Sequence, residues 1–200
     1  EELVRGGKAG ADYLLSISEK NFNILDEVSS IPILIPSSPG DMKSLERIIM
    51  KVKRTNRKFF ADPILDPIHY GFTESINRFT KIRKKFPDVN LLMGVGNLTE
   101  LTDCDSTGVN TVLMGIVSEL NVKAVLVVQV SNHCSTSIKE TDMARRLMFF
   151  AKKNQRLPLG INNSLMCLKD RKVRRNEVEE ITDLKNLIKD KNYRILLSDE

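Results

Sequence analysis

The stretch FFADPILDPIHYGF, residues 59–72, decides how this chain is interpreted. Apolar residues run up to Asp62, and Asp-Pro pairs begin at Asp62 and at Asp66. A residue before proline avoids the helical region, and Asp-Pro commonly opens a turn. The stretch therefore predicts a buried strand that delivers a carboxylate from its tip. A stiff, turn-rich loop should follow before the next helix.

Short apolar runs alternate along the chain with longer amphipathic segments. Strand-like runs lie at 13–17, 31–36, 58–62, 90–95 and 122–130, and helical patterns lie at 20–28, 41–54, 73–86, 106–120 and 138–153. Consecutive apolar residues followed each time by a helix are typical of a parallel sheet covered by helices. Two architectures fit this order: a doubly wound open sheet, and most of a (β/α)8 barrel.

The alternation of strands and helices stops near residue 154. After it come, in order, a turn-rich connector at 155–164, the basic run KDRKVRR at 169–175, a short helix near 176–189 and the strand-like run YRILLS at 193–198. We therefore predict a first domain over 1–154. Residues 155–200 should be a linker with the start of another α/β module, or an arm that wraps back on the first. Both ends look cut, so we expect a fragment of a longer protein.

Composition argues against several classes of protein. No apolar run is long enough to span a membrane, so we predict no membrane partner. The three cysteines, Cys104, Cys134 and Cys167, are scattered and odd in number, which favours the reducing cytoplasm over a disulfide framework. The formal net charge of +5 favours anionic partners. Few aromatic residues accompany the basic run at 169–175, so we interpret it as solvated surface rather than a nucleic-acid site.

Polar side chains stand where the strands end, which is where parallel α/β folds build their sites. They include Ser16, the SSPGD turn at 37–41, Asp62, the GVGN turn at 94–97, and Gln129. A carboxylate accepts two parallel hydrogen bonds from an N–H and an adjacent NH2 group. Such a set suits a flat heterocycle with a donor edge, such as a pterin, a guanine-like ring or a flavin edge. The plainer interpretation is that Asp62 only caps a turn, and helix capping explains SSPGD as well as anion binding does.

Other reactive side chains give weaker signals. His69 and His133 have no cysteine or carboxylate at a metal-ligand spacing, so we predict no metal. No base is identifiable beside Cys104 or Cys134, which we interpret as buried or incidental cysteines.

The order of these pieces resembles bacterial dihydropteroate synthases and the related pterin-binding methyltransferases. The likeness spans residues 7–153 and is carried by ADPILDPIHYGFTESINRF (61–79), LLMGVGNLTEL (91–101), GADYLLSIS (10–18) and IKETDMARRL (138–147). It implies a (β/α)8 TIM barrel in which the five strands are strands four to eight, with three more upstream. It also leads us to expect a homodimer through the barrel helices.

The resemblance implies roles for individual residues. Asp62 matches the aspartate that holds the amino-pyrimidine edge of the pterin. Asn97 matches the asparagine that, in the methyltransferases, lies beside the reactive side of the ring. Gly94 matches the glycine of that turn, and Gly96 stands where a serine would be. The loop from Ile64 to Phe72 would shape the mouth of the site.

The chain also departs from the synthases. Their pterin-contacting lysine is absent from the turn at 94–98, and Gln129 lies on the last strand, where they carry an arginine and a histidine. Leu15, with Ser16 beside it, replaces the strand-four asparagine. Cationic groups would stabilise a departing diphosphate. The chain therefore resembles a dihydropteroate synthase-related protein of the kind associated with archaea, and we count Ser16 and Gln129 among the pterin-binding residues.

These observations predict a pterin-binding protein of folate or tetrahydromethanopterin metabolism, whose ligand is a reduced pterin. If active, it would be a transferase that condenses a pterin-methyl group with an arylamine, with catalytic residues unassigned. One alternative is a pterin-dependent methyltransferase that works with a corrinoid partner. Another is a non-catalytic pterin-binding or scaffold module with a degenerate site.

Overall fold

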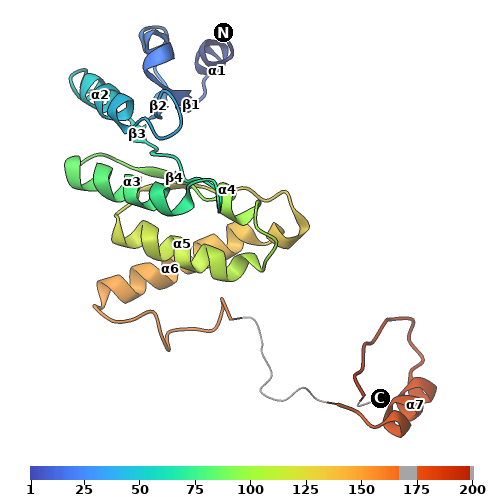
Figure 1. Ribbon diagram of the computed structural model, residues 1–200. Coiled ribbons are helices and arrows are strands. Elements are labelled where there is room, and N and C mark those ends of the chain that lie inside the picture. Colours follow the sequence, from blue (N-terminus) through green and yellow to red (C-terminus); the bar gives the residue numbers. More distant parts are fainter. Residues whose placement is uncertain (167–174, 199–200) are drawn as a thin grey trace. The chain divides into compact units, whose positions relative to one another are not determined.

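The computed structural model describes residues 1–166 and 175–198. The chain divides into two units, Glu1–Leu165 and Met166–Glu200 (Figure 1). This division falls after Leu165, whereas the sequence prediction places the change after residue 154. All the named strands belong to the first unit.

Short parallel strands form the frame of the first unit. They are β1 (Tyr13–Ile17), β2 (Ile31–Leu34), β3 (Phe60–Ala61), β4 (Leu92–Gly94) and β5 (Ala124–Leu126). β1, β2 and β3 pair in that order in one sheet, and β4 pairs with β5 in a second. A single parallel bridge from Ala61 to Leu91 joins the two sheets. Every strand lies inside its predicted segment, and the predicted parallel pairing is confirmed.

The predicted (β/α)8 barrel is wrong. The described residues form five short strands in two small parallel sheets, and no barrel is closed. A barrel needs a hydrogen-bonded neighbour on both sides of every strand. In the part of the chain that the structure describes, β1 pairs only with β2 and β5 only with β4. The protein is a mixed α/β protein whose two described sheets are joined by the single bridge and do not close. The predicted numbering of the strands as four to eight of a barrel is therefore wrong too.

Helices connect the strands of the first unit. They are α1 (Glu2–Lys8), the 3-10 helix η1 (Glu19–Asp26), α2 (Met42–Lys53), α3 (Phe72–Lys85), α4 (Gly96–Thr99), α5 (Ser106–Glu119), the 3-10 helix η2 (Asn132–Cys134) and α6 (Ser137–Lys153). The helices predicted at 41–54, 73–86, 106–120 and 138–153 are confirmed. Their apolar stripes are the cause: Leu45, Ile48, Ile49 and Val52 of α2 are all buried.

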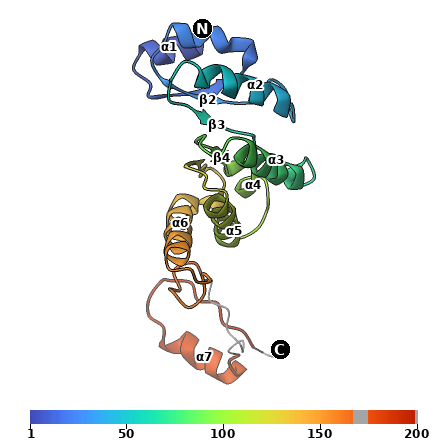
Figure 2. The ribbon, with the colours of Figure 1, turned by 90° about the vertical axis from the view of Figure 1, so that its left-hand side faces the viewer.

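The two faces of the sheet differ because successive side chains of a strand point to opposite sides. One face packs against α2, α3 and α5 in a core that includes Leu34, Ala61, Leu91 and Met93. The other face is apolar but open, with Tyr13 52%, Leu15 49% and Leu126 45% exposed. α5 and α6 lie side by side in both ribbon views (Figures 1 and 2).

The second unit contains α7 (Val178–Leu187), which agrees with the helix predicted near 176–189. No residue of α7 is buried. The strand predicted at 193–198 is wrong, since those residues have no regular structure and no ladder to join. Cys167 and most of the basic run at 169–175, up to residue 174, lie outside the described residues.

Candidate ligand site at the end of β3

Asp62 follows the last residue of β3 and stands on the open face of the sheet. Phe60 lines a hollow on that face, and Ala61 is fully buried on the helix side. Because side chains alternate along a strand, Asp62 shares the face of Phe60. The bridge pairs Ala61 with Leu91, so Asp62 stands in register beside Leu92. The sequence prediction of a carboxylate at a strand tip is met in this position.

The hollow on the open face has a volume of about 310 Å3. Every strand contributes an apolar side chain to its lining: Leu15, Ile33, Phe60, Leu92 and Leu126. Asp62 is not itself a lining residue, but its chain neighbour Phe60 and its register neighbour Leu92 are, so the backbone at Asp62 adjoins the hollow. A cavity of this size is at the lower end for small-molecule sites.

The carboxylate of Asp62 is incompletely satisfied. Burial raises the pKa of Asp62 to about 6, although the hydrogen bond from Ile64 and the nearby Arg78 guanidinium both lower it. The Ile64 N–H donates to Oδ1 at 2.8 Å, and within the described residues no group donates to Oδ2. A desolvated carboxylate with a free oxygen and a pKa near neutrality is typical of a functional position.

The loop that follows Asp62 holds a strained conformation. Ile64 has φ 67°, a region that β-branched residues rarely adopt. Its N–H is bound by Asp62, its carbonyl accepts from Arg78 Nη2 at 2.8 Å, and the next residue, Leu65, is buried in the core. Strain persists only where its surroundings fix it, and such positions cluster at ligand sites.

Arg78 of α3 ties this loop together. Its side chain is only 7% exposed. Nε donates to the Pro63 carbonyl at 3.2 Å, and Nη2 donates to the Ile64 carbonyl and to Asp66 Oδ2 at 2.5 Å. The sequence pattern does not single out Arg78, but it stands directly before Phe79 on the buried face of the helix, where a cation is unusual.

Asn97 is brought to the same loop as Asp62. Its Nδ2 donates to the Leu65 carbonyl at 2.8 Å, so the two predicted residues hold opposite ends of one short segment. Gly94 ends β4 in register with Leu126, and a Cβ there would meet open space. Gly96 differs, because a Cβ there would lie 2.7 Å from Val128 Cγ2. Gly96 therefore permits close packing rather than facing a ligand.

The two other predicted residues are engaged elsewhere. Ser16 is the bulged residue of β1, and its carbonyl accepts from Asn21 Nδ2 at 3.0 Å. Gln129 follows β5, and its Oε1 accepts from the Ile138 N–H at 3.4 Å near the start of α6. Among the described residues no hydrogen bond joins either one to Asp62.

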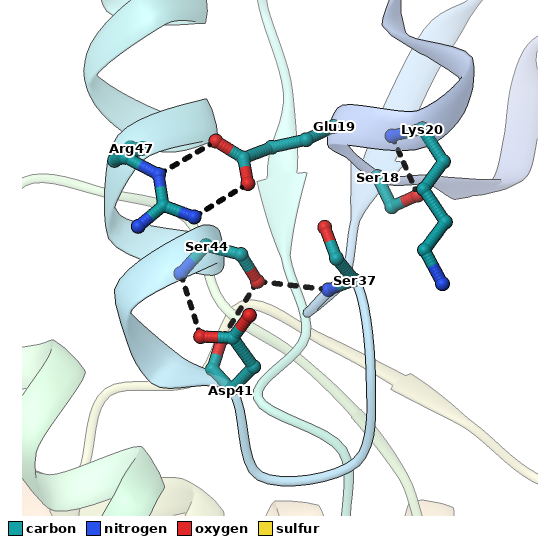
Figure 3. Close-up of polar contacts among 7 residues, drawn as sticks. All are labelled: Ser18, Glu19, Lys20, Ser37, Asp41, Ser44 and Arg47. Atoms are coloured by element: carbon teal, nitrogen blue, oxygen red, sulfur yellow. Dashed lines mark hydrogen bonds and ion pairs between the residues drawn. The ribbon is translucent and has the colours of Figure 1, made fainter.

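The turn after β2 serves α2 (Figure 3). Asp41 Oδ1 accepts from the Ser44 N–H at 3.1 Å, and Ser44 Oγ accepts from the Ser37 N–H at 2.8 Å. Arg47, one turn further along, makes a two-pronged pair with Glu19 at 2.8 and 2.7 Å. Of the two interpretations of this turn, capping is the one that these bonds favour.

Glu100, a second carboxylate near strand ends, contrasts with Asp62. It follows α4 and accepts the backbone N–H groups of Val130 at 2.8 Å and Ser131 at 2.9 Å. Hydrogen bonds from Ser131 and Val130 lower the pKa of Glu100 to about 2. This carboxylate fastens the chain that follows β5.

Two further searches cover the described residues alone. Over 1–166 and 175–198, no cluster of three or more His, Cys, Asp or Glu side chains is placed to hold a metal ion. Nor does any helix there combine the length and apolarity needed to cross a membrane.

No family model matches the chain. The chain is 37% identical over 202 residues to an uncharacterized protein, MJ0107, of Methanocaldococcus jannaschii. The match covers 91% of this chain and 37% of that protein. The chain thus spans just over a third of its relative's length.

Proposed function

We propose that this chain binds a reduced pterin through Asp62. The observation that carries the proposal is a carboxylate with a free oxygen and a pKa of about 6, on a backbone position that adjoins an apolar hollow. The amino-pyrimidine edge of a pterin presents an NH2 group beside a ring N–H. Two parallel hydrogen bonds to one carboxylate match that edge, and Oδ1 can still accept a second donor beside Ile64.

The surroundings of Asp62 support a flat ligand. The strained loop fixes the carboxylate before any ligand arrives, which lowers the entropy lost on binding. The apolar hollow suits the faces of a ring system, and open space at Gly94 leaves room beside it. Asn97 uses its Nδ2 on the loop, and its side-chain carbonyl oxygen remains an acceptor for a ring N–H.

The metabolic setting belongs to the same proposal. On the resemblance stated for residues 7–153, we propose that the protein acts in folate or tetrahydromethanopterin metabolism, in the cytoplasm, as a transferase on the pterin. We propose binding for Asp62 and Asn97 and assign no residue a catalytic role.

Calorimetric titration with 7,8-dihydropterin and 7,8-dihydrolumazine tests the proposal. The two ligands differ in carrying an amino group or an oxygen at one ring position, so a carboxylate should prefer the pterin. Asp62→Asn keeps the acceptor for Ile64 but turns a free acceptor into a donor. We expect the variant to lose about 10- to 100-fold in affinity for the pterin and to shift its preference to the lumazine.

Asp142→Asn is the matched control, because Asp142 is an exposed carboxylate of α6 that pairs with Arg145 and Arg146. It should bind both ligands like the unchanged chain. Equal pterin affinity in the Asp62→Asn and unchanged chains, or no pterin binding at all, contradicts the proposal.

A further inference from the structure

The loop after β3 carries two carboxylates, Asp62 and Asp66, and a single buried guanidinium, Arg78, lies close to both. Arg78 pairs with Asp66, with Nη2 2.5 Å from Oδ2. It does not pair with Asp62 in the described structure, although its charge is near enough to lower the pKa of Asp62. Which carboxylate Arg78 pairs with matters, because an ion pair between Arg78 and Asp62 would occupy the free oxygen of Asp62.

Arg78 keeps the capacity to bind a further acceptor. Its bonds to Pro63, Ile64 and Asp66 use Nε and Nη2. Nη1 has no hydrogen-bond partner among the described residues.

A guanidinium that is 7% exposed has little access to water, so losing its anion would favour a turn toward another carboxylate. The charge of Arg78 lowers the pKa of both Asp62 and Glu74. Glu74 is exposed and already pairs with Lys81, which leaves Asp62 as the alternative partner.

Asp66 is placed to prevent that turn. Gly71, at the start of α3, has φ 114°, and a Cβ built there would lie 3.0 Å from Asp66 Oδ2. Glycine therefore leaves the space in which the Asp66 carboxylate reaches Arg78. Asp66 neutralises the guanidinium within the loop itself, four residues beyond Asp62.

We propose that Asp66 is a positioning residue that holds the Arg78 guanidinium away from Asp62, which keeps one Asp62 oxygen free for the donor edge of a ligand. The ligand in this statement rests on the proposed function, whereas the arrangement of the three side chains does not. Asp66 thus acts through Arg78, without touching the ligand. The repeated Asp-Pro of the loop then has two distinct tasks, one for each carboxylate.

Carboxyl carbon NMR of the ligand-free chain, labelled at aspartate, tests the arrangement. Asp62 should titrate at about 6 in the unchanged chain. In Asp66→Asn, which keeps the size but not the charge, Arg78 should pair with Asp62, and the pKa of Asp62 should fall clearly. Asp66→Ser is a second uncharged variant and should give the same fall. Asp66→Glu retains the anion and should leave the pKa near that of the unchanged chain.

Asp142→Asn again serves as the control for loss of an exposed carboxylate, and it should not move the titration of Asp62. If the pKa of Asp62 stays unchanged or rises in the folded Asp66→Asn or Asp66→Ser chain, the proposal is overturned and Asp66 only braces the loop.

Binding of 7,8-dihydropterin separates this inference from the proposed function. We expect Asp66→Asn to bind the pterin about 10-fold or more weakly, because Asp62 is then occupied by Arg78. If the unchanged chain fails to bind the pterin while Asp66→Asn still lowers the pKa of Asp62, the proposed function fails and the positioning role of Asp66 stands. Unweakened binding by Asp66→Asn overturns the positioning role alone.

Discussion

The segment that follows β3 contains the carboxylate of Asp62, and the segment that follows β5 contacts the carboxylate of Glu100. The two carboxylates differ in their hydrogen bonds and in the direction of their pKa shifts. Glu100, which follows α4, accepts two backbone N–H groups of the segment after β5, and its pKa is lowered to about 2. After β3, Asp62 accepts one, and burial raises its pKa to about 6. Both oxygens of Glu100 accept backbone N–H groups, which holds the segment after β5 in place. Asp62 accepts one backbone N–H through Oδ1, and its Oδ2 has no donor among the described residues. The surroundings of the two carboxylates, more than their residue types, set the direction in which their pKa values shift.

Removing the guanidinium from the β3 side of this comparison should have the largest effect. Arg78→Met leaves Asp66 and the carbonyls of Pro63 and Ile64 without their donors. We expect the free energy of unfolding to fall by about 3 kcal/mol, as for a broken buried ion pair, measured by urea unfolding. Arg145→Met, which breaks an exposed pair with Asp142, is the control and should change it by less than about 1 kcal/mol. Losses of equal size would show that Arg78 does not organise the loop.

The contact between α4 and the chain after β5 should come next. In Gly96→Ala the new methyl group lies 2.7 Å from Val128 Cγ2, so the segment after β5 must shift. We expect a loss of about 1–3 kcal/mol in thermal or urea unfolding, as for other overpacked positions. Gly94→Ala is the matched control, since its Cβ meets open space. A tolerated Gly96→Ala would mean that this packing is looser than the structure has it.

The charge of Asp62 should reduce stability, in contrast to that of Glu100. A folded-state pKa near 6 lies above the unfolded value of about 3.9, so stability should fall as pH rises between these values. Asp62→Asn should therefore be more stable than the unchanged chain at pH 8, by about 1–2 kcal/mol. The gain should vanish below about pH 4, where both states are protonated. Differential scanning calorimetry across this range measures it, and a destabilised Asp62→Asn at pH 8 would contradict the account.

Glu100 should show the reverse sign and the smallest effect. Its pKa is lowered on folding, so its contribution is present above the unfolded value of about 4.3 and is lost as pH falls toward 2. We expect Glu100→Gln to lower Tm modestly at pH 7, with a difference that shrinks in acid. Added salt should also shrink it, because water and ions screen this exposed carboxylate. A higher Tm for Glu100→Gln than for the unchanged chain at pH 7 would contradict the stabilising role of Glu100 in this comparison.

Local patterns predict the elements of this fold better than their assembly. The stripe from Leu45 to Val52 is a property of twelve-residue α2 alone, and it places that helix correctly. Closure of a sheet depends on contacts between its first and last strands, which no local period encodes. The predicted barrel therefore fails, although the five strands predicted between residues 13 and 130 are present.

The candidate site divides in a similar way. Asp62 follows apolar residues on one short strand, so its position at the strand end can be read from the sequence. The role that the resemblance implies for Asn97 stays a prediction, and the bond that Asn97 makes, to the Leu65 carbonyl, could not be read from the sequence. The pairing of Arg78 with Asp66 depends on how α3 packs against the loop, and no spacing rule reports that.

The pH dependence of 7,8-dihydropterin affinity tests most directly whether Asp62 binds as a free, titrating carboxylate. Calorimetric titrations between about pH 5 and 7.5 should give constant affinity above the pKa of about 6 and a loss approaching tenfold per pH unit below it. Asp62→Asn should bind weakly with no such dependence. Affinity that is flat across this range in the unchanged chain, or a transition that persists in Asp62→Asn, would contradict the account.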